Sequence, residues 1–329
     1  MLRLILGLLL TYTLHAKSYT DNQNTQAFIE KMVEVHQLDR AYLERLFSSV
    51  DVQKTPLRII ARDPNEEPTE EQKNKYTYYG AWDRYIKHKI TPKRIKDGRR
   101  YLRKYKTTFA RVEKLYGIPS EYIAAIIGIE SAYGHNVGKY PVFDTLCTLA
   151  FEENRRSSFF KRELEKFLLL SHNNNFNPKK VKGSYAGAIG IGQFMPSSYE
   201  AFGVDFNHDG KVSLLHPHDA IASIANYLHK HGWQKDEEVA TRVSYNGTRF
   251  SKYQTGYNRT YDRSELKGIK PKSKPWPYHD KVRLIKLNTK HHDELWYGAK
   301  NFYVITRYNH SAYYAMSVHQ LATKIKEIL

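Results

Sequence analysis

The sequence predicts a mainly helical protein of the α+β class with one small β-rich insertion. Three observations support this. Apolar residues recur at helical spacing through most of the chain up to residue 232. Residues 122–134 are apolar on nearly all sides, which is typical of a helix buried in a core. From residue 233 onward, short apolar runs alternate with glycine- and proline-containing turns, which indicates strands.

The first third of the chain is expected to be helical and basic. Apolar residues at helical spacing between 28 and 46 predict one or two short helices. The stretch 51–80 is rich in Lys, Glu, Pro and Tyr with weak periodicity, and we expect an extended surface connection there. Residues 81–86 open the next helical region. A long basic helix follows over 95–116, with its Lys and Arg side chains on a solvated face.

The remaining elements alternate in type. Further helices are expected over 141–151, 159–170 and 219–231, the last one ended by Gly232. Strands are expected at 240–244 and 282–286, and the last thirty residues or so return to helix. The chain shows no internal repeat of solenoid length.

The amino-acid composition limits the classes of binding partner. Of the 329 residues, 41% are hydrophobic and 26% charged, which is typical of a folded protein and excludes disorder. The formal net charge of +18 indicates an anionic partner, such as nucleic acid, a membrane surface or an acidic polymer like the bacterial cell wall. The 26 tyrosines supply flat amphipathic surface that suits sugar rings, bases or peptides alike.

The N-terminal sequence indicates export, which bears on the choice among these anionic partners. Arg3 precedes an apolar run over 4–10, and 11–16 can carry a cleavage site, so residues 1–16 predict a secretory signal peptide that is too short to span a membrane. Cys147 is the only cysteine, which leaves no lipid-attachment cysteine after the signal and no internal disulfide. We therefore expect an exported periplasmic protein without a lipid anchor or stable membrane insertion. Export disfavours nucleic acid as the partner.

Glu130 is the candidate catalytic residue. It stands near the C-terminal end of the helix expected within 122–134, where the helix dipole disfavours negative charge. Burial disfavours the charged carboxylate as well, so the pKa of Glu130 should be raised. A carboxylic acid that stays protonated near neutral pH can act as a general acid. The alternative is a structural Glu turned to solvent in the last helical turn.

Residues 183–199 are dense in glycine. The pattern matches neither the phosphate-binding loop nor the dinucleotide fingerprint. The glycines therefore indicate close approach of the backbone, either to a ligand or to a neighbouring helix. Ser184 and Gln193 could hydrogen-bond a polar ligand. Packing between helices is the alternative reading.

A candidate calcium loop follows. Residues 205–210 match D-x-N-x-D-G, the first half of a calcium-binding loop. The twelfth position is His216, a poor calcium ligand, but Asp219 could complete the ligand shell. The predicted ligands of a structural Ca²⁺ are Asp205, Asn207, Asp209, the Lys211 carbonyl and Asp219. The alternative is a turn rich in Asp and Asn with no metal. No organic cofactor is expected.

Together these pieces resemble the membrane-bound lytic transglycosylase B family of bacterial peptidoglycan-cleaving enzymes. The Gln-Phe-Met-Pro-Ser-Ser-Tyr run at 193–199, next to the Asp loop, is the most specific match. The other matching stretches, in family order, are 126–134, Arg155-Arg156, 183–192, 205–219, 225–227 and 305–311.

The resemblance implies a goose-lysozyme-like helical catalytic core with an N-terminal helical domain and a small β-rich insertion. The implied segments are the signal peptide (1–16), the N-terminal helical domain (17–110), the lysozyme-like core (111–232) with its calcium loop (205–219), the β-rich insertion (233–300) and a C-terminal helix returning to the core (301–329).

The resemblance also implies cleavage of the MurNAc–GlcNAc β-1,4 bond without water, which leaves a 1,6-anhydromuramoyl end. Glu130 would act first as acid and then as base. Ser184 and Asn309 would hold the acetamido group of the muramoyl residue, and Arg155 and Arg156 would meet the anionic peptide stem. The implied sugar subsites are lined by Tyr85, Gln193, Tyr227, Tyr308 and Tyr314. Peptidoglycan strands are the expected partner, and other cell-wall enzymes are further candidates.

Two rival functions stay open at this stage. A hydrolytic muramidase on the same fold would need a held water and a second carboxylate, for which Asp144, Glu152 and Glu153 are candidates only by proximity. A non-catalytic cell-wall-binding protein would not need the acid at all. The chain also departs from the family pattern at Ser131-Ala132, a smaller pair than expected after the acid.

Overall fold

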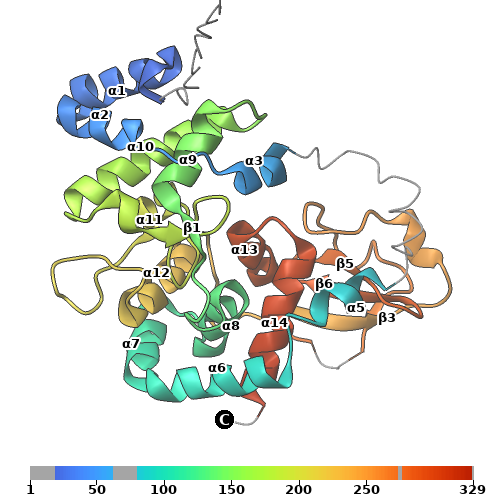
Figure 1. Cartoon of the computed structure of the whole chain (residues 1–329). Coiled ribbons are helices and arrows are strands. Elements are labelled where there is room, and N and C mark those ends of the chain that lie inside the picture. The colour runs from blue at the N-terminus through green and yellow to red at the C-terminus, as the bar shows by residue number, and fades with distance from the viewer. Residues whose placement is uncertain (1–18, 62–79, 273–275, 328–329) are drawn as a thin grey trace, which may run out of the picture.

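The computed structural model describes residues 19–61, 80–272 and 276–327 (Figure 1). The signal peptide predicted at 1–16 lies outside these residues, as does most of the connection predicted at 51–80. Along the described part of the chain, no helix has both the length and the apolar character that crossing a bilayer requires.

The N-terminal helices pack on a helical pair from the middle of the chain. Phe28, Phe47 and Phe143 lie in one hydrophobic cluster, and their rings meet edge to face. In Figure 1 this group forms the upper left of the molecule. Its elements are η1 (Tyr19–Asp21), α1 (Gln23–His36), α2 (Arg40–Ser48), α3 (Lys54–Ala61), α9 (Val142–Phe151), α10 (Ser157–Asn173) and η2 (Pro178–Lys180).

The extended connection predicted over 51–80 is wrong for residues 54–61, which form helix α3. Pro56 stands in its first turn, where a missing amide hydrogen costs no helical hydrogen bond. Leu57 and Ile60 pack into the cluster shared with α9. The contact with α9 stabilises a helix whose own periodicity is too short to reveal it.

The long basic helix expected over 95–116 is two helices, α6 (Pro92–Lys104) and α7 (Lys106–Tyr116). They meet at Tyr105, whose ψ of 28° departs from helical geometry. Both halves pack against the same central helix, which one straight helix could not do. The break therefore follows from tertiary packing.

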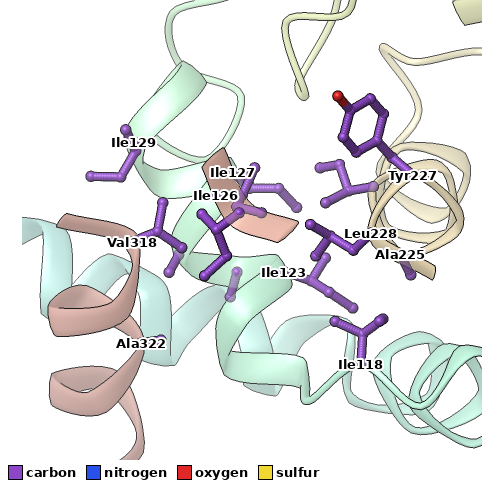
Figure 2. Packing of buried hydrophobic residues seen from close by; sticks show 14 of the residues in the cluster. Ile118, Ile123, Ile126, Ile127, Ile129, Ala225, Tyr227, Leu228, Val318 and Ala322 are labelled. Atoms are coloured by element: carbon purple, nitrogen blue, oxygen red, sulfur yellow. The ribbon is translucent and has the colours of Figure 1, made fainter. Parts of the chain in front are cut away.

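Helix α8 (Ser120–Ser131) is the central helix of the second cluster. It is surrounded by α6, α7, α12 (Pro217–Lys230) and α14 (Ala312–Lys326). Figure 2 shows Ile126 facing Val318 of α14, while Ile123 lies toward Leu228 of α12. Seven consecutive residues of α8, from 123 to 129, are buried, which confirms the prediction of a helix enclosed on nearly all sides.

Tyr133, just after α8, holds α6 and α8 together. Its hydroxyl donates to the Arg94 carbonyl over 2.9 Å. A Cβ added to Gly98 of α6 or to Gly128 of α8 would lie 2.5 Å from the Tyr133 hydroxyl. The two glycines therefore leave the space that the phenol ring occupies between the helices.

The strands of the predicted insertion form one antiparallel sheet in the order β4-β3-β6-β5. Strands β5 and β6 make a hairpin in which Asn288 pairs with Asp293. A third cluster, which includes Tyr297 and Trp276, packs around this sheet. The strands are β3 (Ala240–Ser244), β4 (Lys270–Pro271), β5 (Arg283–Asn288) and β6 (Asp293–Gly298), with η3 (Arg249–Lys252) between β3 and β4.

The chain then returns to the core in two helices, α13 (Lys300–Tyr308) and α14, where one was expected. Residues 309–311 separate them, and Ser311 caps α14 by accepting the Tyr314 amide over 3.2 Å. The remaining elements are α5 (Ala81–Ile86), α11 (Pro196–Phe202) and a two-stranded ladder of β1 (Tyr140–Pro141) and β2 (Lys182–Gly183).

The three hydrophobic clusters do not follow the predicted boundary at residue 110. Helices α1 to α3 pack with α9 and α10, whereas α6 packs with α8 and α14. The domain boundaries therefore stay predictions, while the mainly helical fold with a small antiparallel sheet is confirmed.

Replacing Gly128 with Ala is expected to destabilise the fold by about 1–3 kcal/mol, although Ala favours helix, because the new methyl group collides with the Tyr133 ring. Urea unfolding measures the change. In a Tyr133→Ala background the same substitution should cost far less. An equal cost in both backgrounds would contradict the proposed packing.

Candidate active site

Glu130 lies in the last turn of α8 and remains partly exposed at the residue level. Burial of the carboxyl group raises its pKa from 4.5 to about 7. A hydrogen bond from Tyr314 and the positive charge of Lys89 oppose this rise. The carboxyl group can therefore be present in both its protonated and its ionised form near neutral pH.

The backbone turns sharply directly after Glu130. Ala132, Tyr133 and Gly134 all have positive φ, at 49°, 64° and 87°, and the two non-glycine residues are strained there. Ser131 is fully buried, and its hydroxyl accepts the Gly134 amide over 3.0 Å. The smaller Ser131 therefore serves to close the helix end.

Tyr314 donates its hydroxyl hydrogen to Glu130 Oε1 over 2.6 Å. The ring sits in the first turn of α14, whose start is fixed by the Ser311 cap. Tyr314 is only 3% exposed, and both burial and the negative charge of Glu130 raise the pKa of its phenol. Tyr314 therefore stays a hydrogen-bond donor across the whole range in which Glu130 titrates.

Two further tyrosines extend from this pair. The Tyr308 ring lies parallel to that of Tyr314, with centroids 6.4 Å apart. The Tyr308 hydroxyl donates to the Gly192 carbonyl over 2.6 Å. Tyr227 meets Tyr308 edge to face at 4.9 Å and donates to the Arg307 carbonyl over 2.6 Å. The structure thus brings Glu130, Tyr314, Tyr308 and Tyr227 together.

The glycine-rich stretch packs close to backbone and side chains. A Cβ at Gly192 would lie 2.9 Å from the Tyr308 hydroxyl. Gln193 adopts a φ of 52°, and its amide nitrogen donates to the Val137 and Gly190 carbonyls. The Ser184 hydroxyl oxygen accepts the amides of Ala186 and Ala188, which leaves its hydrogen to donate elsewhere. Both predicted residues therefore lie on a loop held rigid by its own hydrogen bonds.

Tyr85 and Lys89 approach the site from α5 and the turn after it. Burial raises the pKa of Tyr85, and the negative charge of Glu130 raises it further. The Tyr85 ring stacks on that of Trp82. Burial lowers the pKa of Lys89, and Glu130 opposes this. Sequence reasoning missed Lys89. The only signal was its place one helical turn after Tyr85.

Three predicted residues lie on exposed turns. Asn309 follows α13 and is exposed. Arg155 and Arg156 are exposed between α9 and α10, and the Arg156 guanidinium lies 4.5 Å from the Phe159 ring centroid. Apart from Leu170 near the C-terminal end of α10, the buried hydrophobic residues of α9 and α10 lie in the first cluster and not in that of α8, so shared packing does not tie this arginine pair to Glu130.

The candidates for a second carboxylate have other roles. Asp144 forms an ion pair with Lys179 over 2.6 Å. Glu152 accepts the Tyr19 hydroxyl over 2.8 Å, and Glu153 is exposed. Among the described residues, the groups that shift the pKa of Glu130 are Tyr314 and Lys89, and neither is acidic.

In the loop over 205–219, backbone amides donate hydrogen bonds to carboxylate oxygens of the same loop. Asp219 is fully buried and accepts the amides of Phe206 and Ser213. Asp205 accepts the Gly210 amide, and Asp209 the Lys211 amide, both over 2.9 Å. In the described ranges, no three His, Cys, Asp or Glu side chains gather closely enough to hold a metal ion. The oxygen-rich ligand types nevertheless suit a hard cation.

The transglycosylase SLT domain family matches residues 20–323 of this sequence. The chain belongs to this family. It is 40% identical over 309 residues to membrane-bound lytic murein transglycosylase B of Escherichia coli (strain K12), an alignment that spans 93% of this chain and 84% of that protein. The chain is therefore a lytic murein transglycosylase, an enzyme that acts on peptidoglycan, as its motifs predicted.

Solved structures support the same family assignment. The Escherichia coli lytic transglycosylase SLT35 in complex with bulgecin A superposes with a TM-score of 0.85 at 39% identity, covering 93% of this chain and 94% of that one. The same enzyme in complex with calcium gives a TM-score of 0.85 at 38% identity with the same coverage. The expected fold is thereby confirmed.

A Tyr314→Phe variant should raise the pKa of Glu130 above the wild-type value of about 7, because it removes the hydrogen bond that stabilises the carboxylate. A rise of about one unit corresponds to one lost hydrogen bond. Carbon-13 NMR of labelled Glu, assigned with Glu130→Gln, measures it. Tyr313→Phe is the control and should leave the midpoint in place. A lower or unchanged midpoint in Tyr314→Phe would refute the role of this bond.

Proposed function

We propose that Glu130 alone performs both proton transfers of a non-hydrolytic cleavage. Its carboxylic acid protonates the oxygen that leaves C1 of the muramoyl residue as the C1–O bond breaks. The acetamido oxygen of the same sugar bonds to C1. The C6 hydroxyl then displaces it, and Glu130 accepts the hydroxyl proton. The products are a free GlcNAc hydroxyl and a 1,6-anhydromuramoyl end, and the acid is regenerated.

The Tyr314–Glu130 pair carries this proposal. A carboxyl group with a pKa of about 7 exists in both protonation states near neutral pH, which suits an acid that later acts as a base. The hydrogen bond over 2.6 Å holds it in one orientation. Hydrolysis is less well supported, because Asp144 and Glu152 are committed to Lys179 and Tyr19.

We propose further that the residues named by the family resemblance form the substrate groove. Tyr85, Gln193, Tyr227, Tyr308 and Tyr314 would line the sugar subsites. Ser184, whose hydroxyl hydrogen remains to be donated, would hold the acetamido group together with Asn309. Arg155 and Arg156, exposed at the α9–α10 turn, would meet the carboxylates of the peptide stem.

We also propose that the loop over 205–219 holds a structural Ca²⁺. Asp219 is a fully buried carboxylate whose described partners are backbone amides, and a cation would compensate its charge. Asp205, Asn207, Asp209 and the Lys211 carbonyl would supply further oxygens. The calcium complex of the similar SLT35 supports this proposal.

Location follows from the sequence expectations. We infer that residues 1–16 direct export and that the enzyme acts in the periplasm. Peptidoglycan strands are its partner there, and other cell-wall enzymes are candidates. The relative from Escherichia coli is described as membrane-bound.

Glu130→Gln should abolish anhydromuropeptide release from purified sacculi, a loss of at least about a thousandfold, because the amide cannot donate the catalytic proton. Mass spectrometry of the soluble products measures it. Glu153→Gln, which changes an exposed acid, is the matched control and should keep wild-type activity. Residual activity of Glu130→Gln above a tenth of wild type would refute the assignment. A protein inactive in both forms that still binds sacculi would favour the cell-wall-binding alternative.

Calcium should raise the thermal stability of the protein, with about 2.7 kcal/mol gained at a concentration one hundred times the dissociation constant. Calorimetry with Ca²⁺, and then with a chelator, measures the difference. Asp209→Asn should lose the response without unfolding, since Asp209 is exposed. Asp280→Asn is the control at another exposed acid and should keep it. A calcium response that survives in Asp209→Asn would contradict the assigned ligands.

A further inference from the structure

A pocket lies next to α8, the helix that carries Glu130. It has a volume of about 490 Å³ and opens between α6, the turn after α8 and the start of α12. None of the residues assigned to the substrate groove lines it. We call it the α6 pocket. Its lining includes Arg100, Tyr101, Lys104, Tyr105, Tyr133 and His135.

The floor of the α6 pocket is aromatic. The Tyr101 ring lies 4.7 Å from that of Tyr105 and 5.6 Å from that of Tyr133, centroid to centroid. Tyr101 is only 7% exposed, and its hydroxyl has no hydrogen-bond partner within the described part of the chain. A buried hydroxyl without a partner is costly, so this polar atom sets Tyr101 apart from an ordinary core residue.

The rim of the pocket is cationic. Arg100 and Lys93 share one carboxylate, that of Asp97, over 2.9 and 2.5 Å. Lys104 stands over the Tyr105 ring, with its amine 5.1 Å from the centroid. The lining thus carries one carboxylate, Asp97, and two cations, Arg100 and Lys104, so the pocket retains a positive excess that attracts an anionic group. Arg100 and Lys104 are exposed and can reach such a group.

The pocket adjoins the active site through two loops. Tyr133 follows Glu130 by three residues in the sharp turn after α8. Ile191, on the pocket wall, precedes Gly192, whose carbonyl accepts the Tyr308 hydroxyl. A ligand in the pocket would thus lie beside the groove without occupying it.

We propose that the α6 pocket is a second peptidoglycan-binding site, which takes a muramoyl peptide from a strand other than the one being cleaved. Tyrosine rings suit the apolar face of a sugar ring. Arg100 and Lys104 suit the carboxylates of the lactyl group and the peptide stem. This inference rests on the proposed function, since it assumes peptidoglycan as the substrate. It also assigns a role to the basic face that the sequence presented only as solvated.

Binding can be tested without turnover in the Glu130→Gln protein with carbon-13-labelled tyrosine rings. The GlcNAc–MurNAc disaccharide carrying a tetrapeptide should shift the Tyr101 and Tyr105 signals, which Tyr→Phe variants assign. Chitotetraose, which has no carboxylate, should shift them far less at the same concentration. Arg100→Gln and Lys104→Gln should each weaken this response about tenfold. Lys114→Gln, on the exposed face of α7, is the charge-matched control and should bind like the parent protein.

Tyr101 and Tyr105 signals that do not shift with the disaccharide–tetrapeptide would overturn the proposal. Equal shifts from chitotetraose would overturn it too, because the carboxylates of the ligand would then have no role. Unfolding curves of Arg100→Gln and Lys104→Gln, measured alongside, verify that these exposed substitutions leave the fold intact. A response that is insensitive to both cations would equally overturn it.

Turnover separates this inference from the proposed function. Wild-type cleavage of a short soluble glycan, which needs only the groove, tests the proposed function alone. The Arg100→Gln/Lys104→Gln double variant should then lose about tenfold in kcat/KM on intact sacculi and keep the wild-type value on the short glycan. Equal losses on both substrates, or no loss on either, would overturn a second site.

Discussion

The hydrogen bond from Tyr314 to Glu130 joins two residues that are 184 positions apart and fixes the geometry of the candidate active site. It can form only where the end of α8 meets the start of α14. The packing of α14 along α8 brings the two ends together, and Ser311 determines where α14 begins. The core around α8 is therefore a requirement of the Tyr314–Glu130 pair as well as of stability.

This bond also balances the acidity of Glu130. Burial favours the protonated acid, whereas Tyr314 and Lys89 favour the carboxylate. The result, a pKa of about 7, lies between an ordinary carboxylic acid and one that never ionises. A residue that donates a proton and later recovers one needs this intermediate value. Tyr314 can keep donating because its own pKa is raised well beyond the working range.

The sequence predicted the features that depend on local pattern. The apolar run before Glu130 specified a buried helix, and Asp205 with its neighbours specified a tight oxygen-rich turn. It could not predict features created by contacts between distant segments. The break at Tyr105 and the helix α3 exist because of what they pack against. Lys89 acts on Glu130 across the fold, and its place four residues after Tyr85 does not reveal that contact without the structure.

The central claim is that a single acid, Glu130, serves both steps and that water takes no part in the reaction. The most direct test is to digest sacculi with the wild-type enzyme in water enriched in oxygen-18 and to analyse the muramoyl ends by mass spectrometry. If Glu130 serves both steps and the C6 hydroxyl is the nucleophile, the new ends contain no oxygen-18. Products that gain one oxygen-18 atom at each new muramoyl end would show that water attacks C1. That result would contradict the account and make the enzyme a hydrolase.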